Sequence, residues 1–326
     1  MAVETVLLTG ATGFVGPHVV EALRPLVRIR ALVRDLTRAA PLAAKGVELV
    51  QGTLETANRI PGLVDGVDAI VHLAAATRAA SEQAFERANA LGTGALLEAA
   101  RAARPRTRFV YLSSLAAVGP ARNGRPVTAD DEPMPLTAYG RTKLAGERLV
   151  AQAAGPLEVA ILRAPAVYGP GERDLYEFFV MAARGILPVP TGPARPLQMV
   201  HVTDLARALA LCATGKPVRG VYHIAEPQAY LWEQVGRLVA RAVGKRARVV
   251  RIPGAAIAAA GAVSEWVGKI RGQPAIFSRD KARELLAPGW LCETETAHRD
   301  FGFVAQIPLE QGLAETADWY RANGWL

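Results

Sequence analysis

A tyrosine and a lysine four positions apart, Tyr139 and Lys143, are the residues of this 326-residue chain whose types and spacing most directly suggest chemistry. Residues four apart on a helix lie on one face, so a helix here would hold an ammonium group beside a phenol, whose ordinary pKa is about 10. A nearby cation lowers the pKa of a phenol and makes it usable as an acid or base. The pair follows a glycine-rich turn and a serine pair, Ser113 and Ser114. This combination predicts proton transfer at a site shared by the three motifs.

The glycine-rich turn, residues 9–16, joins an apolar strand-like run to a helix-like segment. Free backbone N–H groups and the helix dipole at such a junction favour a phosphate group. In the pattern G-x-x-G-x-x-G, Gly10 permits a tight turn, Gly13 lets the backbone approach a pyrophosphate, and Gly16 lets the helix pack closely on the sheet. The turn therefore predicts a dinucleotide site, with an ordinary strand-to-helix turn as the alternative.

The end of the second predicted strand indicates which dinucleotide is bound. An acidic residue about twenty positions after the glycines usually binds the adenosine ribose hydroxyls, whereas an arginine there accommodates a 2′-phosphate. Here the apolar Val33 is followed by Arg34 and then by Asp35. Arg34 favours NADP over NAD, with Asp35 as the rival ribose ligand and a surface ion pair as the alternative.

The elements that must position these residues follow from the apolar pattern. Runs of strand length alternate with longer helix-period segments through the first half of the chain, which is typical of a parallel sheet covered by helices. Long helices are expected at 81–101, capped by Ser81, and at 138–154, which carries Tyr139 in its first turn. Right-handed crossovers then give a doubly wound α/β sheet. The strands expected in this half are residues 5–9, 27–33, 47–51, 69–73, 109–112 and 159–162.

The second half of the chain is less regular. From Tyr168 onward, frequent glycines and prolines predict loops that shape a substrate pocket. A helix period returns at 201–215 and a strand pattern at 221–224, so the chain is expected to re-enter the sheet. The predicted organisation is a dinucleotide-binding core at residues 1–170, re-entered at about 197–226, and a smaller, mostly C-terminal substrate-binding region at 171–196 and 227–326.

Composition and charge narrow the class of protein. The chain is 51% hydrophobic and 21% charged, a globular profile, and the apolar run at residues 252–264 is too short to span a bilayer. Two distant cysteines, Cys212 and Cys292, and an N-terminus without a leader pattern favour a reducing, cytoplasmic location. His72 and His201 belong to no cluster with metal-ligand spacing, so no metal site is expected.

The net charge of +8 is concentrated in residues 237–283, which carry eleven Lys and Arg against Glu265 and Asp280. A solvated basic face is the favoured interpretation, ahead of an anionic substrate or a membrane surface. Nucleic acid is disfavoured because no recognisable binding module or set of stacking aromatics accompanies the cations.

Five further motifs resemble those of one family. They are similar to the cofactor-loop, active-site and late signature motifs of extended short-chain dehydrogenases/reductases, the epimerase/dehydratase superfamily, and the resemblance covers essentially the whole chain. The motifs are residues 71–75 (VHLAA), 89–93 (NALGT), 110–114 (VYLSS), 163–171 (RAPAVYGPG) and 200–204 (VHVTD).

The resemblance implies that Ser114 holds the substrate oxygen, that Tyr139 exchanges a proton with it, and that Lys143 binds the nicotinamide ribose and lowers the tyrosine pKa. It implies a Rossmann fold with NADP, preferred, or NAD as the hydride carrier. It also implies a homodimer formed through the helices at 81–101 and 138–154. Thr53 stands where the family usually has an aspartate beside the adenine. The cofactor-binding residues expected are Gly10, Thr12, Gly13, Phe14, Val15, Gly16, Arg34, Thr53, Leu54, Leu73, Ala74, Ala75, Asn89, Leu112, Tyr139, Lys143, Pro165 and Val167.

The branch of the family decides the substrate class. Sugar dehydratases place an acidic pair after the active-site hydroxyl residue, but Leu115 and Ala116 follow Ser114 here, so dehydration is not expected. Nucleotide-sugar epimerases tend to have an arginine where Leu197 stands, with Arg195 two residues earlier.

The C-terminal motifs, which end in residues 319–326 (WYRANGWL), resemble the dihydroflavonol-reductase and hydroxysteroid-dehydrogenase-like branch. They predict an NAD(P)-dependent oxidoreductase that acts on a carbonyl or alcohol of a lipophilic small molecule. An NAD-dependent nucleotide-sugar epimerase and a non-catalytic dinucleotide-binding protein are the alternatives. The apolar residues 252–270 are expected to form a wall or lid of the site, or else an ordinary core helix.

Overall fold

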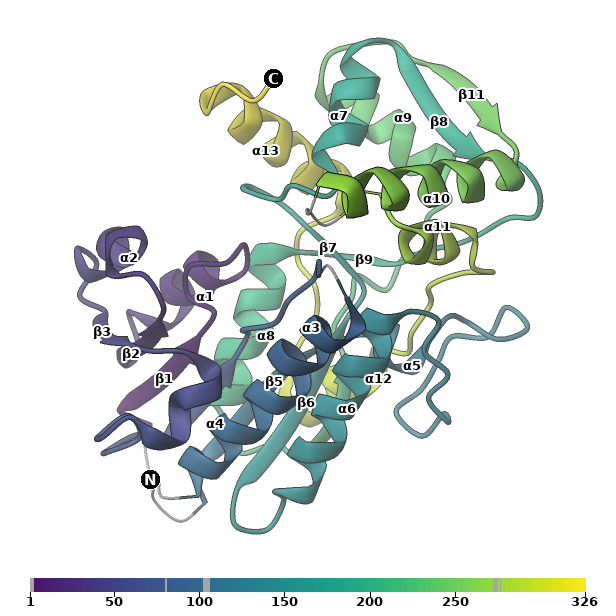
Figure 1. The fold of residues 1–326 in the computed structure, drawn as a ribbon. Helices are drawn as coiled ribbons and strands as arrows, with labels where there is room; N and C mark the ends of the chain where they lie inside the picture. The colour runs from purple at the N-terminus through teal and green to yellow at the C-terminus, as the bar shows by residue number, and fades with distance from the viewer. Residues whose placement is uncertain (1–2, 80, 102–105, 272–274, 276) are drawn as a thin grey trace.

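The computed structural model describes residues 3–79, 81–101, 106–271, 275 and 277–326. Its centre is a seven-stranded, all-parallel sheet with the strand order β10-β6-β5-β4-β1-β2-β3 (Figure 1). The order reverses between β1 and β4, and ligands of doubly wound folds bind at such a switch point. The strands are β1 (Thr5–Thr9), β2 (Arg28–Val33), β3 (Glu48–Gln51), β4 (Ala69–His72), β5 (Arg108–Ser114), β6 (Glu158–Ala164) and β10 (Gly220–His223).

Helices cover both faces of the sheet. Each strand carries apolar side chains on both of its faces, and both must be buried. One face packs against α1 (Gly16–Leu23) and α8 (Val202–Thr214), and the other against α4 (Gly92–Ala100) and α6 (Ala138–Gln152). Smaller elements complete this part: α2 (Leu36–Ala43), α3 (Glu82–Glu86), α5 (Leu115–Val118), α12 (Glu295–Phe301), the 3₁₀ helix η1 (Leu54–Arg59) and the π-helix η2 (Arg87–Leu91). The predicted α/β doubly wound fold is confirmed.

A smaller lobe lies beyond the carboxyl ends of the strands (Figure 1). Its own apolar core contains Phe179, Leu187, Val235, Leu313 and Tyr320. The elements of the lobe and its connection are β7 (Ala166–Tyr168), α7 (Tyr176–Ala183), β8 (Ile186–Pro190), β9 (Met199–His201), α9 (Trp232–Ala242), β11 (Arg248–Ile252), α10 (Gly254–Arg271), α11 (Arg279–Leu286) and α13 (Leu309–Ala322). The chain does return to the sheet at β10, while the domain boundaries drawn from the sequence stay a prediction.

The expected elements agree closely with the observed ones, since each predicted strand of the sheet differs by no more than two residues at either end. The helix predicted at 81–101 begins as expected, because the Ser81 hydroxyl accepts a hydrogen bond from the Ala84 N–H at 3.2 Å. It is not one α-helix, however. A π-helical turn, η2, separates α3 from α4, and it carries the buried Asn89. Single π-turns inside helices are frequent at functional sites.

Candidate active site

The glycine turn between β1 and α1 has the shape that a pyrophosphate requires. Gly10 has φ +75, and a Cβ there would lie 2.7 Å from the Ala74 nitrogen; a Cβ at Gly16 would lie 2.3 Å from the Ala11 carbonyl oxygen. Neither position tolerates a side chain without a shift of backbone. Gly13 is exposed and closes the turn with an N–H bond of 3.0 Å to the Gly10 carbonyl. The turn therefore fits a dinucleotide at the helix N-terminus.

The neighbouring aromatic Phe14 is half-buried and makes an edge contact with the His18 ring, at 6.1 Å between ring centres. His18 in turn lies 3.1 Å from the Pro170 carbonyl oxygen. This contact joins the glycine turn to the segment that follows β7. Thr12 and Val15 lie in the same turn and are half-buried.

The end of β2 presents two arginines toward this turn. Arg34 is exposed directly after the strand, and the Arg38 guanidinium donates to the Thr12 carbonyl at 3.3 Å. Asp35 is the N-cap of α2 and accepts a hydrogen bond from the Arg38 N–H at 3.1 Å. The sequence analysis named Arg34 and overlooked Arg38. The signal that could have indicated it is its place in the first turn of the helix that follows Arg34, close to the end of the strand.

The loop after β4 faces the glycine turn, and the side chain of Asn89 forms hydrogen bonds with its backbone. The Asn89 side chain accepts from the Ala76 N–H at 2.7 Å, donates to the Ala76 carbonyl at 3.1 Å, and donates to the Thr142 hydroxyl at 3.1 Å. Leu73, Ala74 and Ala75 of this loop are half-buried. Asn89 therefore orders the backbone of the loop, and the nearby Thr142 ties that loop to the helix of Tyr139.

The remaining predicted cofactor residues are spread around this edge of the sheet. Thr53 caps η1, with its hydroxyl 3.1 Å from that of Thr56, and Leu54 packs close to Gly92 of α4. Pro165 and Val167 are half-buried beside β7. These positions fit the edge where the carboxyl ends of parallel strands meet, which is where ligands of this fold bind.

The three predicted catalytic residues meet at the ends of β5 and α6. Thr137 caps α6 by accepting from the Gly140 N–H at 3.1 Å, which places Tyr139 in the first turn. The Ser114 hydroxyl accepts a hydrogen bond from the Ala116 N–H at 3.1 Å and is near enough to the Tyr139 phenol to oppose a rise of its pKa. The Lys143 ammonium donates to the Leu112 carbonyl at 2.7 Å and lies 4.1 Å from the centre of the Tyr111 ring. A phenol, a hydroxyl and an ammonium are thus arranged on one edge.

Burial dominates the electrostatics of this set. Burial raises the pKa of Tyr139 to about 12, the bond with Ser114 opposes this, and the carboxylates of Glu284 and Asp174 add to it. Burial lowers the pKa of Lys143 to about 7, partly offset by Glu147. Desolvation is thus the largest influence on the pKa of each group, and the lowering of the tyrosine pKa by Lys143 stays a prediction.

A buried ion pair lies directly beneath these residues. Arg163 of β6 donates to both carboxylate oxygens of Glu147, at 3.0 and 2.7 Å, and Ser113 also donates to this carboxylate. The side chains of Arg163 and Glu147 are 4% and 5% exposed. The sequence analysis overlooked Glu147, although it stands four residues after Lys143 and eight after Tyr139 on the same helix face. The pair fixes α6 against the sheet.

The other wall of the site comes from the smaller lobe. Asp280 of α11 accepts from the Ala138 N–H at 2.9 Å, and Thr137 donates to Glu284 at 3.3 Å, so α11 rests on the start of α6. Asp174 forms an ion pair with Arg78 and lies 3.9 Å from Lys281. These contacts join three segments that are distant in sequence around Tyr139.

The histidines that could suggest a metal have other partners. His72 is fully buried, with Nδ1 2.7 Å from the Thr9 hydroxyl and Nε2 2.9 Å from the Thr93 hydroxyl. Burial lowers the pKa of His72 to about 3, so the ring stays neutral. In the described part of the chain, His72 is a structural residue that joins β1, β4 and α4.

The sheet is doubly wound and carries a glycine turn at its switch point. A serine, a tyrosine and a lysine lie at its carboxyl edge. These features together define a nicotinamide-dependent enzyme of the short-chain dehydrogenase/reductase class. The model of the NAD dependent epimerase/dehydratase family matches residues 6–225. The chain belongs to this family, of the extended type, and is an NAD(P)-dependent enzyme.

Individual relatives cover almost the whole chain. A ceramide reductase of Caulobacter vibrioides is 36% identical over 335 residues, which cover 98% of this chain and 96% of the relative. A second relative, from Stigmatella aurantiaca, is a 4-hydroxy-2-methyl-3-oxo-4-farnesyl-3,4-dihydroquinoline-1-oxide ketoreductase. It is 29% identical, and the alignment covers 94% of this chain and 93% of the relative. Among solved structures, MoeE5 in complex with UDP-glucuronic acid and NAD superposes with a TM-score of 0.75 at 27% identity, covering 98% of this chain and 99% of that one.

Proposed function

We propose that this protein is an NADP-preferring reductase or dehydrogenase that interconverts a ketone and an alcohol on a lipophilic small molecule. The observation that carries the proposal is the proximity of Ser114 to the Tyr139 phenol, with Lys143 one helical turn further on, at the edge of the sheet that also carries the glycine turn. The two reductases reported above act on lipophilic substrates by their names, and both cover nearly the whole chain.

In the proposed reaction the nicotinamide, when bound, supplies or accepts the hydride at the carbonyl carbon. The Ser114 hydroxyl donates a hydrogen bond to the carbonyl oxygen and orients it. Tyr139 transfers its phenolic proton to that oxygen as negative charge develops there, and takes the proton back in the reverse direction. Lys143, whose ammonium donates to the Leu112 carbonyl here, would hold the ribose hydroxyls of the bound cofactor and stabilise the phenolate.

The alternative of a nucleotide-sugar epimerase requires cations for a diphosphate. Arg195 is already engaged, because its guanidinium donates to the carbonyls of Leu286 at 3.1 Å, Thr191 at 3.1 Å and Pro193 at 3.2 Å. Leu197, where an epimerase tends to have arginine, is 3% exposed and pairs with Tyr230. These contacts favour the reductase over the epimerase.

The substrate class is tested by turnover of the purified protein with NADPH. We expect NADPH oxidation with long-chain ketones and keto lipids, because the site lies beside an apolar lobe. UDP-sugars serve as the competing panel. Interconversion of a UDP-sugar without net consumption of cofactor, together with no activity on any ketone, would establish the epimerase instead.

Arg34 and Arg38 together support the preference for NADP. Asp35 is engaged as the cap of α2, while Arg34 is exposed at the end of β2 and the Arg38 guanidinium contacts the glycine turn at Thr12. We expect NADPH to bind more tightly than NADH, and Arg34→Ala to weaken NADPH about tenfold or more, since a hydrogen bond to a charged group contributes roughly 1.5–3 kcal/mol. Fluorescence titration of both cofactors measures this. Arg24→Ala, an exposed arginine at the far end of α1, is the matched control. Equal affinities for the two cofactors in parent and variant would refute the assignment.

The homodimer and the cytoplasmic location remain proposals. The dimer is supported by α4 and α6 lying side by side on one face of the sheet, where Leu91 at the start of α4 is 59% exposed (Figure 1). The location is supported by two buried free thiols, Cys212 and Cys292. The solution mass by light scattering tests the dimer.

A further inference from the structure

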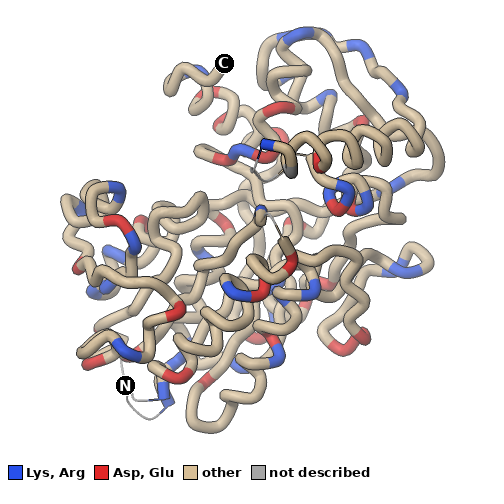
Figure 2. The backbone as a smooth tube through the Cα atoms, in the orientation of Figure 1, with Lys and Arg blue, Asp and Glu red and all other residues tan. Residues whose placement is uncertain are grey.

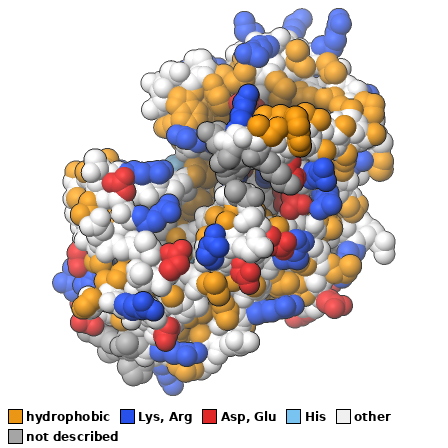
Figure 3. All heavy atoms as spheres, viewed as in Figure 1, with side chains coloured by type: hydrophobic (Ala, Val, Ile, Leu, Met, Phe, Trp, Pro, Cys, Tyr) orange, Lys and Arg blue, Asp and Glu red, His pale blue; other side chains and the backbone are white. Residues whose placement is uncertain are grey.

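The helix α10 is apolar along a face that nothing in the described chain covers. Its large exposed side chains are Val263 at 61%, Trp266 at 64% and Ile270 at 66%. At 3.6 residues per turn they align with the exposed Ala256 and Ala259 into one stripe about 80° wide. Figure 3 shows hydrophobic side chains gathered along this helix. The expectation of a core helix is wrong here, because only a narrow opposite face is buried.

The buried face of α10 packs on α11. Ile257 is 6% exposed, and a Cβ at Gly261 would lie 2.9 Å from the Ser278 carbonyl, so the two helices approach closely. Three charged residues belong to α10. By helical position Glu265 is on the side opposite to Val263, Lys269 falls about 60° beyond Trp266, and Arg271 is at the C-terminal end. The stripe itself, from Ala255 to Ile270, is therefore free of charge.

Cations stand around the stripe without acidic partners. Lys245, Arg246 and Arg248 are exposed just before α10, and Arg271 is exposed at its end. Among the described residues none of these four forms an ion pair, whereas Arg237 and Arg251 nearby share the carboxylate of Glu233. Figure 2 shows Lys and Arg along the upper rim of the lobe, above α10. The exposed Val250 and Ile186 of β11 and β8 extend the apolar surface between the cations.

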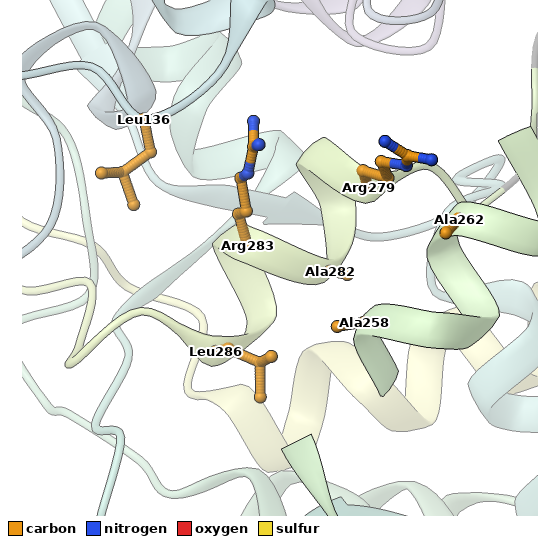
Figure 4. Close-up of a pocket in the computed structure, with 7 residues that line it drawn as sticks. All are labelled: Leu136, Ala258, Ala262, Arg279, Ala282, Arg283 and Leu286. Atoms are coloured by element: carbon orange, nitrogen blue, oxygen red, sulfur yellow. The ribbon is translucent and has the colours of Figure 1, made fainter. Parts of the chain in front are cut away.

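A cavity lies between α10 and α11, next to the stripe. It has a volume of about 630 Å³ and is lined by Leu136, by Ala258 and Ala262 of α10, and by Arg279, Ala282, Arg283 and Leu286 of α11 (Figure 4). Leu136 stands three residues before Tyr139, so the cavity lies next to the start of the catalytic helix. The same helix thus carries an exposed apolar stripe and, next to it, part of a cavity that mixes apolar side chains with two arginines near the start of α6.

We infer that the stripe on α10, with its rim of cations, docks the protein onto an anionic lipid bilayer. An apolar helical face flanked by Lys and Arg is the pattern of helices that lie in a membrane interface, and tryptophan is enriched at that depth. In the described residues no helix is long and apolar enough to cross a membrane. A second protein copy is disfavoured as the occupant because symmetric docking would bring the unpaired cations together.

This docking goes beyond the proposed reaction and complements it. A lipophilic substrate dissolved in the bilayer would reach the cavity between α10 and α11 without crossing water. The apolar side chains would enter the boundary of the acyl chains, and the guanidinium and ammonium groups would contact phosphate headgroups. Binding to vesicles is measured without turnover, so failure of the docking and failure of the proposed function are distinguishable.

The test is co-sedimentation of the full chain with vesicles of mixed phosphatidylglycerol and phosphatidylcholine, and with phosphatidylcholine alone. We expect binding to the anionic vesicles, weakened by salt and much lower on the neutral ones. Val263→Ser with Ile270→Ser should weaken binding about tenfold or more, because two apolar side chains lose their burial in the interface. Arg246→Glu with Arg248→Glu should weaken it about 30-fold or more, from the contribution of each cation near an anionic surface.

Matched controls lie at the opposite edge of the sheet. Leu26 is 60% exposed and Lys216 is exposed without an ion pair in the described residues, so Leu26→Ser and Lys216→Glu should bind vesicles like the parent. Cofactor titration checks that every variant is folded. The inference is overturned if the parent stays in the supernatant, or if the stripe and charge variants bind like the parent. It is also overturned if the stripe variant lowers the solution mass and leaves vesicle binding unchanged, since the stripe would then join two protein copies.

Discussion

Replacing Tyr139 with phenylalanine is expected to reduce turnover by about 10²–10⁴-fold, the usual contribution of a positioned acid or base, while the affinity for NADPH stays close to that of the parent. Only the phenolic oxygen is lost, and the helix that carries it is capped by Thr137 and packed on α11. The measurement is turnover with an active ketone beside a cofactor titration. Tyr222→Phe, a buried tyrosine on the edge strand β10, is the matched control and should keep parental turnover.

The same experiment separates the roles of the neighbouring residues. Lys143→Ala should lower both turnover and cofactor affinity, because the proposed role of the ammonium is to grip the ribose as well as to stabilise the phenolate. Ser114→Ala should leave cofactor binding intact and reduce turnover on the order of 10²-fold, as the loss of one oriented donor does elsewhere. Near-parental activity of Tyr139→Phe would remove Tyr139 from the reaction and require another acid.

Replacing Glu147 with glutamine is expected to destabilise the fold by about 3–5 kcal/mol, because Arg163 would be left as a buried charge without a counter-charge. Both side chains are nearly inaccessible, and both carboxylate oxygens accept from the guanidinium. Urea unfolding measures the loss. Glu21→Gln is the matched control: Glu21 also contacts two cations, Arg24 and Lys45, but at the surface. The control should cost less than about 1 kcal/mol.

The origin of the loss at Glu147 can be tested further. A double variant, Glu147→Met with Arg163→Met, removes both charges and keeps the volume, so it should recover much of the stability. If Glu147→Gln unfolds at the same urea concentration as the parent, then the pair does not hold α6 on the sheet. The position of Tyr139 and Lys143 would then depend on the caps and on α11.

Local features of the sequence were sufficient for the framework of the site. The alternation of apolar runs predicts the strands because a parallel strand is buried on both faces, and this property is visible in a few consecutive residues. The glycine turn was recognisable for a similar reason. At Gly10 and Gly16 neighbouring backbone lies too close for a Cβ atom, so only glycine fits, and the glycines are visible in the sequence.

Contacts between distant segments could not be read in this way. Arg38 reaches Thr12 only because α2 folds back over the glycine turn, and Glu147 meets Arg163 only because α6 packs across β6. The exposure of Trp266 could not be predicted from the sequence either. An apolar helical face gives the same pattern of residues whether other parts of the protein cover it or leave it exposed.

The sequence by itself determined that a phenol, a hydroxyl and an ammonium stand in the order and spacing of one family, behind a dinucleotide turn. The tertiary structure decided their electrostatics. Burial raises the pKa of Tyr139 to about 12 and lowers that of Lys143 to about 7, and neither shift can be read from the spacing of the two residues. The physical reason is that residue type and spacing are properties of the chain, whereas desolvation depends on how many distant segments pack around a group.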